Sequence, residues 1–234
     1  ERECIYLLEI IAETIEDAKA IEKGGADRIE LVSALALGGL TPSVGLVKRV
    51  LETVHLPVNI MIRPHDHGFI YTKEELTIMR DDVEAFYRLG AEHVVLGILN
   101  AQGDPDIKAL EYVLGKTPVT ATFHRALDDS RDLLYAMESL GKINRVTHVL
   151  TSGGPGKAEE NLSVLKQLPH KEKRIIVASG VTLKNLDLFK EALGGAEESF
   201  AYDVHVGTGA REQGLHSPVS PSLVHALAEK VRSL

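Results

Sequence analysis

Five polar side chains of the sequence have the types needed for acid–base chemistry on a charged molecule. They are Glu9, Glu30, Arg63, His124 and His205. Each lies in or just after a short apolar segment, as in "TATFHR", where His124 follows alternating threonine and apolar residues. Carboxylates and imidazoles transfer protons, and a guanidinium binds carboxylate or phosphate groups through two parallel hydrogen bonds. These residue types indicate a site that binds an anion and moves protons, provided that the fold gathers them.

Eight apolar segments with helical patterns between them must position these side chains. We expect strands over residues 5–11, 26–32, 58–64, 93–99, 119–125, 148–153, 174–180 and 200–207. Strands that alternate with helices predict a parallel sheet, and eight such units fit a closed barrel of about 250 residues. An open doubly wound sheet would need a glycine-rich turn after the first strand, where the sequence reads "IIAETIED". We therefore predict a single-domain α/β protein, a (β/α)₈ TIM barrel that spans residues 1–234.

Alternation along the strands predicts which side chains face the inside of the barrel. Successive side chains point to opposite faces of a strand, and the carboxyl ends of barrel strands build the active site. We expect the five polar side chains to meet at this rim as candidate catalytic residues, with the His124 ring facing inwards. The alternative is a set of structural ion pairs, such as Glu9 with Arg63 or Glu30 with Arg28, because buried charges are normally paired.

Glycine-rich loops follow the last three strands. They read "TSGGPG" at 151–156, "ASGVT" at 178–182 and "VGTGAR" at 206–211. Barrels commonly bind phosphate through backbone N–H groups of the loops after strands seven and eight, and glycine lets the backbone approach an anion closely. The alternative is that glycine only satisfies the turns. The candidate anion-binding residues are Ser152, Gly153, Ser179, Gly180 and Gly207.

A short loop after the third predicted strand, "RPHDHGF", is a weaker candidate for a metal site. Two histidines and an aspartate can bind a transition metal, and His65 and His67 are separated by one residue. No third ligand is fixed by the spacing. A loop exposed to solvent is the alternative for His65 and His67.

The composition narrows the classes of function. The formal charge is −8 at pH 7, so nucleic acid and an acidic membrane surface are not expected as partners, because neither attracts a net anion. No apolar run approaches the roughly 18 residues of a membrane span. The one cysteine, Cys4, excludes a disulfide within the chain and favours a cytoplasmic location.

Several segments together resemble the CutC copper-homeostasis family. They are "GGADRIELVSALALGGLTPSVG", "LPVNIMIRP", "FHRALD", "LTSGG" and "SGVT", which occur in the family's order over nearly the whole chain. The resemblance implies a cytoplasmic TIM barrel, a link to copper handling, and copper as a cofactor or ligand. Family members often carry cysteine where this chain has Val32, and some where it has Ile11. Copper(I) prefers thiolate and thioether ligands, so these replacements remove the soft ligands that the resemblance implies.

Three functions remain open from the sequence. The first is a CutC-like protein of copper homeostasis that binds copper weakly or acts indirectly. The second is an enzyme that acts on a small anionic or phosphorylated substrate at the carboxyl face of the barrel. The third is a binding or scaffold protein whose barrel carries no chemistry. The apolar segment "SALALGGL" at 33–40 either covers the barrel or contacts a partner, which would be a second copy in a homodimer.

Overall fold

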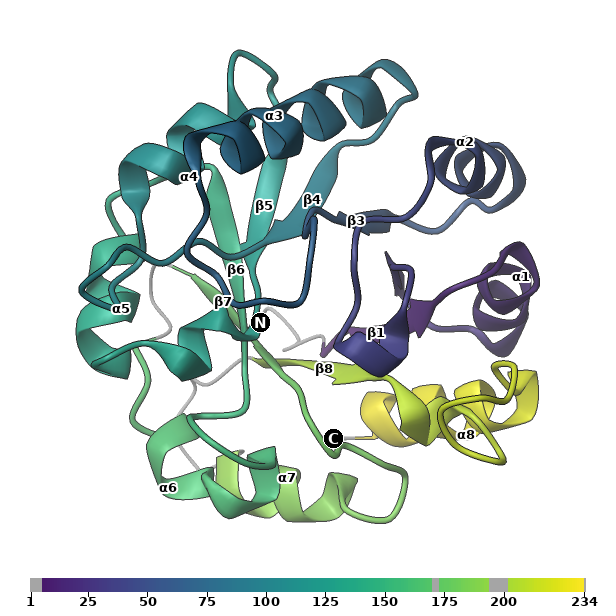
Figure 1. Cartoon of the computed structure of the whole chain (residues 1–234). Helices are drawn as coiled ribbons and strands as arrows, with labels where there is room; N and C mark the ends of the chain where they lie inside the picture. Colours follow the sequence, from purple (N-terminus) through teal and green to yellow (C-terminus); the bar gives the residue numbers. More distant parts are fainter. Residues whose placement is uncertain (1–5, 170–172, 194–201, 234) are drawn as a thin grey trace, which may run out of the picture.

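Eight parallel strands close into a barrel in the part of the chain that the computed structural model describes, residues 6–169, 173–193 and 202–233 (Figure 1). Each strand pairs with its neighbours in sequence order, and β8 pairs with β1. This closure confirms the predicted TIM barrel. The strands are β1 (Leu8–Ala12), β2 (Arg28–Leu31), β3 (Val58–Met61), β4 (His93–Leu96), β5 (Thr120–Phe123), β6 (Val146–Thr151), β7 (Arg174–Val177) and β8 (Tyr202–Val206).

Helices surround the barrel on its outer face (Figure 1). Local side chains define where they begin: Thr72 and Glu75 form a reciprocal capping box at the start of α3. None of the described helices has the length and the apolar character that crossing a membrane requires. The helices are α1 (Ile15–Gly24), α2 (Val44–Thr53), α3 (Lys73–Arg88), α4 (Ile107–Leu114), α5 (Leu133–Leu140), α6 (Leu162–Leu165), α7 (Leu186–Leu193) and α8 (Pro221–Arg232).

Every strand except β1 ends earlier than the sequence predicts, which affects two of the candidate residues. Arg63 and His124 lie just after β3 and β5 rather than within them. The backbone of Arg63 leaves the sheet because its N–H donates to Thr41 Oγ1 and its carbonyl accepts from Thr41 N–H. Both side chains therefore lie at the rim of the barrel, where loops and strands meet.

The barrel has two kinds of buried layer. In the outer layer, apolar side chains of the strands pack against apolar side chains of the surrounding helices and form one large core. Inside the barrel, where branched apolar residues usually dominate, the buried side chains include Glu9, Arg28, Asn59, Asp203 and His205. Nearer the rim a small apolar cluster follows, formed by Ile11, Val32, Met61 and Val95. A charged layer of this kind must be satisfied by internal partners, because buried charges are costly when unpaired.

Candidate functional site

A cavity of about 410 Å³ opens at the carboxyl ends of the strands. Four of the five predicted catalytic residues line it: Glu30, Arg63, His124 and His205. The fifth, Glu9, is fully buried one layer below and touches the cavity only through His205. Alternation along the strands therefore brings four of the five side chains to one rim, whereas Glu9, which was also expected there, lies one layer deeper because it is nearer the start of its strand.

The predicted anion-binding residues divide into two groups. Ser179, Gly180 and Gly207 line the cavity, whereas Ser152 and Gly153 are buried outside its lining. The Ser152 backbone N–H and hydroxyl both donate to Asp128, from the 3₁₀ helix that follows β5. These two residues therefore anchor the loop after β6, and the loops after β7 and β8 are the ones that face the cavity.

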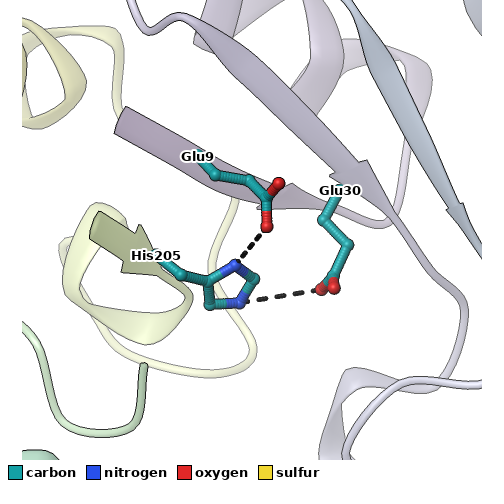
Figure 2. Close-up of side chains that lie close together, drawn as sticks. All are labelled: Glu9, Glu30 and His205. Carbon is teal, nitrogen blue, oxygen red and sulfur yellow. Dashed lines mark hydrogen bonds and ion pairs between the residues drawn. The ribbon is translucent and has the colours of Figure 1, made fainter. Parts of the chain in front are cut away.

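A chain of three residues at the floor of the cavity links β1, β8 and β2. Figure 2 shows the His205 ring between the carboxylates of Glu9 and Glu30. His205 Nδ1 lies 2.7 Å from Glu9 Oε1, and its Nε2 lies 3.6 Å from Glu30 Oε2. A carboxylate that fixes one ring nitrogen leaves the other to exchange protons, which is the arrangement of many acid–base sites.

Below this chain a network of alternating charges holds Glu9 in place. The guanidinium of Arg28 donates to Glu9 at 2.5 Å and to Asp203 at 3.3 Å, and Asp203 also pairs with Arg174 at 2.7 Å. The Asn59 amide donates a further bond of 3.1 Å to Glu9. Buried ion pairs do form, as the alternative interpretation expected, but Arg28 pairs with Glu9 rather than with Glu30.

The environment separates the pKa values of the two glutamates. Burial raises the pKa of Glu30 to about 7, against the opposing effect of the His205 charge. Burial would also raise the pKa of Glu9, but the Arg28 guanidinium and the His205 ring outweigh it and hold that pKa well below its usual range. Burial lowers the pKa of His205, and the charges of Glu30 and Glu9 more than offset it, so the pKa is raised. Glu9 is therefore held in its ionised form, while the protonated form of Glu30 and the charged form of His205 are both favoured.

Arg63 is fixed beside the cavity by the loop after β2. Its Nη1 donates to the carbonyl oxygens of Leu37 and Gly39, at 2.9 and 3.3 Å. The guanidinium also stacks over the Phe69 ring at 5.0 Å. Leu35 and Leu37 of the same apolar loop line the cavity, so the segment at 33–40 forms part of the cavity wall.

The His124 ring is held in one orientation close to Arg63, since both residues pack against Phe69. Its Nδ1 accepts the backbone N–H of Ala126 at 3.0 Å, and the ring packs against Phe69 at 5.1 Å between centroids. Burial lowers the pKa of His124 to about 3, with the Arg63 charge as a second cause. The ring is therefore neutral at physiological pH.

A glycine at the end of β4 makes room for this ring. A Cβ added at Gly97 would lie 2.4 Å from His124 Cε1 and 2.7 Å from Ala126 Cβ. We expect Gly97→Ala to lower the free energy of unfolding by about 1–3 kcal/mol through overpacking, as measured by urea unfolding. Gly45→Ala in α2, where the added Cβ meets nothing within 4 Å, is the matched control and should not destabilise. Equal effects of the two substitutions would contradict the close packing of His124.

The histidines of the loop after β3 have other partners. His65 Nε2 lies 3.0 Å from Glu75, and its Nδ1 accepts the backbone N–H of His67. Among the described residues, the group of three metal-ligand types that lies together is Glu9, Glu30 and His205, whose ligand atoms are within 4.8 Å of one another. His65 and His67 do not belong to this group, so metal binding by them stays a prediction.

Two contributors to the site are absent from the candidate residues that the sequence predicts. Arg28 lies two residues before Glu30, on the same face of β2, so alternation alone could have revealed it. Arg125 lines the cavity, and its guanidinium donates to Asp128 and Ser152. Ser179 is one of the predicted anion-binding residues, but the left-handed φ of 79° at this residue was not predicted. No sequence pattern signals this conformation, because residues other than glycine rarely adopt it.

Comparison with known proteins relates most of the chain to one family. The CutC family model matches residues 6–202. The copper homeostasis protein cutC homolog of Mus musculus is 36% identical over 225 residues, 94% of this chain and 82% of that protein, and the Homo sapiens homolog is 37% identical over 82% of this chain and 71% of its own length. A solved CutC structure from Streptococcus agalactiae superposes with a TM-score of 0.78 at 30% identity, over 87% of this chain and 98% of that chain. The chain belongs to the CutC family.

Proposed function

We propose that this protein is an enzyme that binds a small anionic molecule in the mouth of its barrel and transfers a proton through Glu30 and His205. One observation carries the proposal: the Glu30 side chain, in a residue only 3% exposed, faces the cavity with the His205 ring 3.6 Å away. A buried carboxyl with a pKa of about 7 serves as a general base or acid near neutral pH. Such pKa shifts concentrate at functional sites.

The walls around Glu30 support an anionic ligand. Arg63 and Arg125 both line the cavity, although the chain as a whole is acidic. Ser179 and Gly180 follow β7 in consecutive left-handed conformations, with φ of 79° and 75°. Strained backbone of this kind is found at ligand-binding sites, and turns with left-handed residues present N–H groups to anions.

A binding screen with matched variants tests this proposal. We expect at least one small phosphate or carboxylate compound to bind the wild type, and Arg63→Met to weaken it by about 10–100-fold, because a charge-assisted hydrogen bond is lost. Ligand-observed NMR against a panel of anionic metabolites measures the affinities. Arg80→Met is the control, since Arg80 also stacks on an aromatic ring, Tyr112 at 5.1 Å, but on the helical exterior. Equal affinity in both variants, or no binding to the wild type, would refute the proposal.

The residues present do not fit a copper(I) site of thiolates. Ile11 and Val32, where relatives carry cysteine according to the family resemblance, are aliphatic and pack in one cluster with Met61. Cys4 lies outside the described residues. The remaining ligand types at the cavity are oxygen, imidazole nitrogen and one thioether, whereas copper(I) prefers soft sulfur donors. We therefore propose that any role in copper homeostasis, which the names of the relatives suggest, is indirect.

Anaerobic copper(I) titration against a competing chelator tests this point. We expect wild type and Cys4→Ser to bind copper(I) with the same weak affinity. The double variant Ile11→Cys, Val32→Cys is the positive control, because it adds two thiols beside Met61, and we expect it to bind copper(I) more tightly. Tight binding by the wild type would contradict an indirect role.

Two further properties are part of the proposal. The single cysteine and the acidic composition support a cytoplasmic location. The exposed side chain of Leu37 in the apolar segment at 33–40 supports a homodimer through the rim of the barrel mouth.

A further inference from the structure

The Glu30 carboxylate has no hydrogen-bond partner among the described residues. Glu30 is 3% exposed, and its charged neighbour is His205, whose Nε2 lies 3.6 Å from Glu30 Oε2. That separation is longer than a hydrogen bond. Buried polar groups are normally paired, because leaving one without a partner costs free energy. A buried carboxylate without such a partner therefore requires an explanation.

A ligand in the cavity has access to this carboxylate. Glu30 and His205 both line the cavity. The enclosed polar atoms without a partner in the described part of the chain include Arg63 Nε and His124 Nε2, but no oxygen of Glu30 and no nitrogen of His205. Glu30 and His205 are therefore buried residues that present accessible ligand atoms at the floor of the cavity.

Glu9 orients the His205 ring so that Nε2 is the nitrogen available to a ligand. Glu9 Oε1 lies 2.7 Å from His205 Nδ1. Arg28 and Asn59 hold the Glu9 carboxylate in place with hydrogen bonds of 2.5 and 3.1 Å. An ionised carboxylate only accepts hydrogen bonds, so Nδ1 carries the proton and the lone pair of a neutral ring lies on Nε2. Figure 2 shows this nitrogen directed towards Glu30. Histidines that bind metal ions usually donate their other ring N–H to a carboxylate in this way.

The distance between the two accessible atoms fits one metal ion. Zinc binds imidazole nitrogen and carboxylate oxygen at about 2.0–2.2 Å. Two atoms 3.6 Å apart that both lie at such a distance from one ion form an angle of about 110–130° at the ion, which suits the tetrahedral geometry of zinc. The other positions of the ion face the cavity, where water occupies them.

The arginines of the cavity do not neutralise Glu30. Arg63 Nη1 donates to two carbonyl oxygens of the segment at 33–40, and Arg125 pairs with Asp128 at 2.9 Å. Within the part of the chain that the structure describes, neither arginine forms an ion pair with Glu30. The carboxylate therefore keeps its capacity to bind a cation.

We propose that Glu30 Oε2 and His205 Nε2 bind one divalent transition-metal ion of the zinc type at the floor of the cavity. Imidazole nitrogen and carboxylate oxygen suit such an ion, whereas copper(I) prefers sulfur. The ion and a proton compete for the same two atoms, so a bound ion stops proton transfer through Glu30 and His205. This regulatory consequence rests on the proposed function, whereas metal binding itself does not.

Isothermal titration calorimetry with zinc chloride near neutral pH tests the inference. We expect one tight Zn²⁺ site in the wild type and none for Mg²⁺, which prefers oxygen ligands. Glu30→Gln and His205→Gln should each weaken Zn²⁺ binding by at least about 10–100-fold, the loss that removal of an outer-shell partner already causes. The matched control is His65→Gln. His65 Nε2 also lies beside a glutamate, Glu75, but at the hydrogen-bond distance of 3.0 Å, so this variant should keep the wild-type affinity.

NMR of the histidine ring nitrogens locates the ion in the wild type, even where a variant fails to fold. One equivalent of Zn²⁺ should shift the Nε2 signal of His205 and leave that of the enclosed His124 Nε2 unchanged. Melting temperatures of the variants identify any loss of fold.

Three results would each overturn the metal site. They are no Zn²⁺ binding by the wild type, equal affinity in wild type and folded Glu30→Gln, and a shift confined to other histidines. All three leave the proposed function standing, because the binding of anionic compounds is measured on metal-free protein. Zn²⁺ binding at His205 without binding of any anionic compound would refute the proposed function and keep the metal site.

Discussion

Arg28→Met is expected to lower the free energy of unfolding by about 3–5 kcal/mol, because it breaks a buried ion pair by removing one partner. Arg28 is 7% exposed and donates to Glu9 and Asp203 inside the barrel. Asp203 keeps Arg174 as a partner, but Glu9 would lose its guanidinium in a buried layer. Urea unfolding at neutral pH measures the change.

Two further variants test whether the loss of stability comes from breaking a buried ion pair. Arg232→Met breaks an exposed ion pair with Glu229 on α8, and we expect a change within about 1 kcal/mol. The double variant Arg28→Met, Glu9→Gln removes the stranded charge as well, and should recover part of the stability through coupling of the two sites. A cost below about 1 kcal/mol for Arg28→Met would mean that the charged layer does not depend on this residue.

Glu30→Gln is expected to change how stability depends on pH. The pKa of Glu30 is about 7 in the folded protein and near 4.5 without the fold, so the folded state binds this proton more tightly. The stabilising contribution is therefore complete below about pH 4.5 and is lost as the pH rises through 7. The raised pKa of His205 acts in the same direction. We expect the wild type to lose up to about 3 kcal/mol from Glu30 between about pH 5 and 8.

Urea unfolding of Glu30→Gln at a series of pH values measures how much of the pH dependence of the free energy of unfolding comes from Glu30. Glutamine has no proton to lose, so Glu30→Gln should show a smaller decline over the same pH range. Glu229→Gln, at an exposed position on α8, is the control and should follow the wild type. Identical pH profiles for Glu30→Gln and wild type would show that Glu30 does not titrate in this range.

The alternation of side chains along the strands was sufficient to predict which four residues lie together at the rim of the barrel. Glu30, Arg63, His124 and His205 lie far apart in the sequence, but each occupies the inward face near the carboxyl end of its strand. The two-residue period of a strand fixes the face, and a parallel barrel places all carboxyl ends on one side. The four residues therefore line one cavity, although the strands end earlier than predicted.

The hydrogen-bond and ion-pair partners of these residues could not be predicted. Alternation tells which face of a strand a side chain occupies, but not its position along the barrel axis relative to residues of the other strands. In the register of β1 and β2, Glu9 lies directly beside Arg28, so these two residues pair. Glu30 lies beside Ile11, two residues nearer the carboxyl ends of the strands. That register depends on how all eight strands close. Ser152 illustrates the same limit, since Asp128, from a distant part of the chain, takes its hydrogen bonds.

The direct test of the acid–base site is the titration of the Glu30 carboxyl group by ¹³C NMR, with its signal assigned by comparison with Glu30→Gln. We predict a midpoint near pH 7, since burial raises the pKa of this group to about 7. A midpoint near 4.5, the ordinary value of a glutamate, would contradict proton transfer by Glu30 at the floor of the cavity.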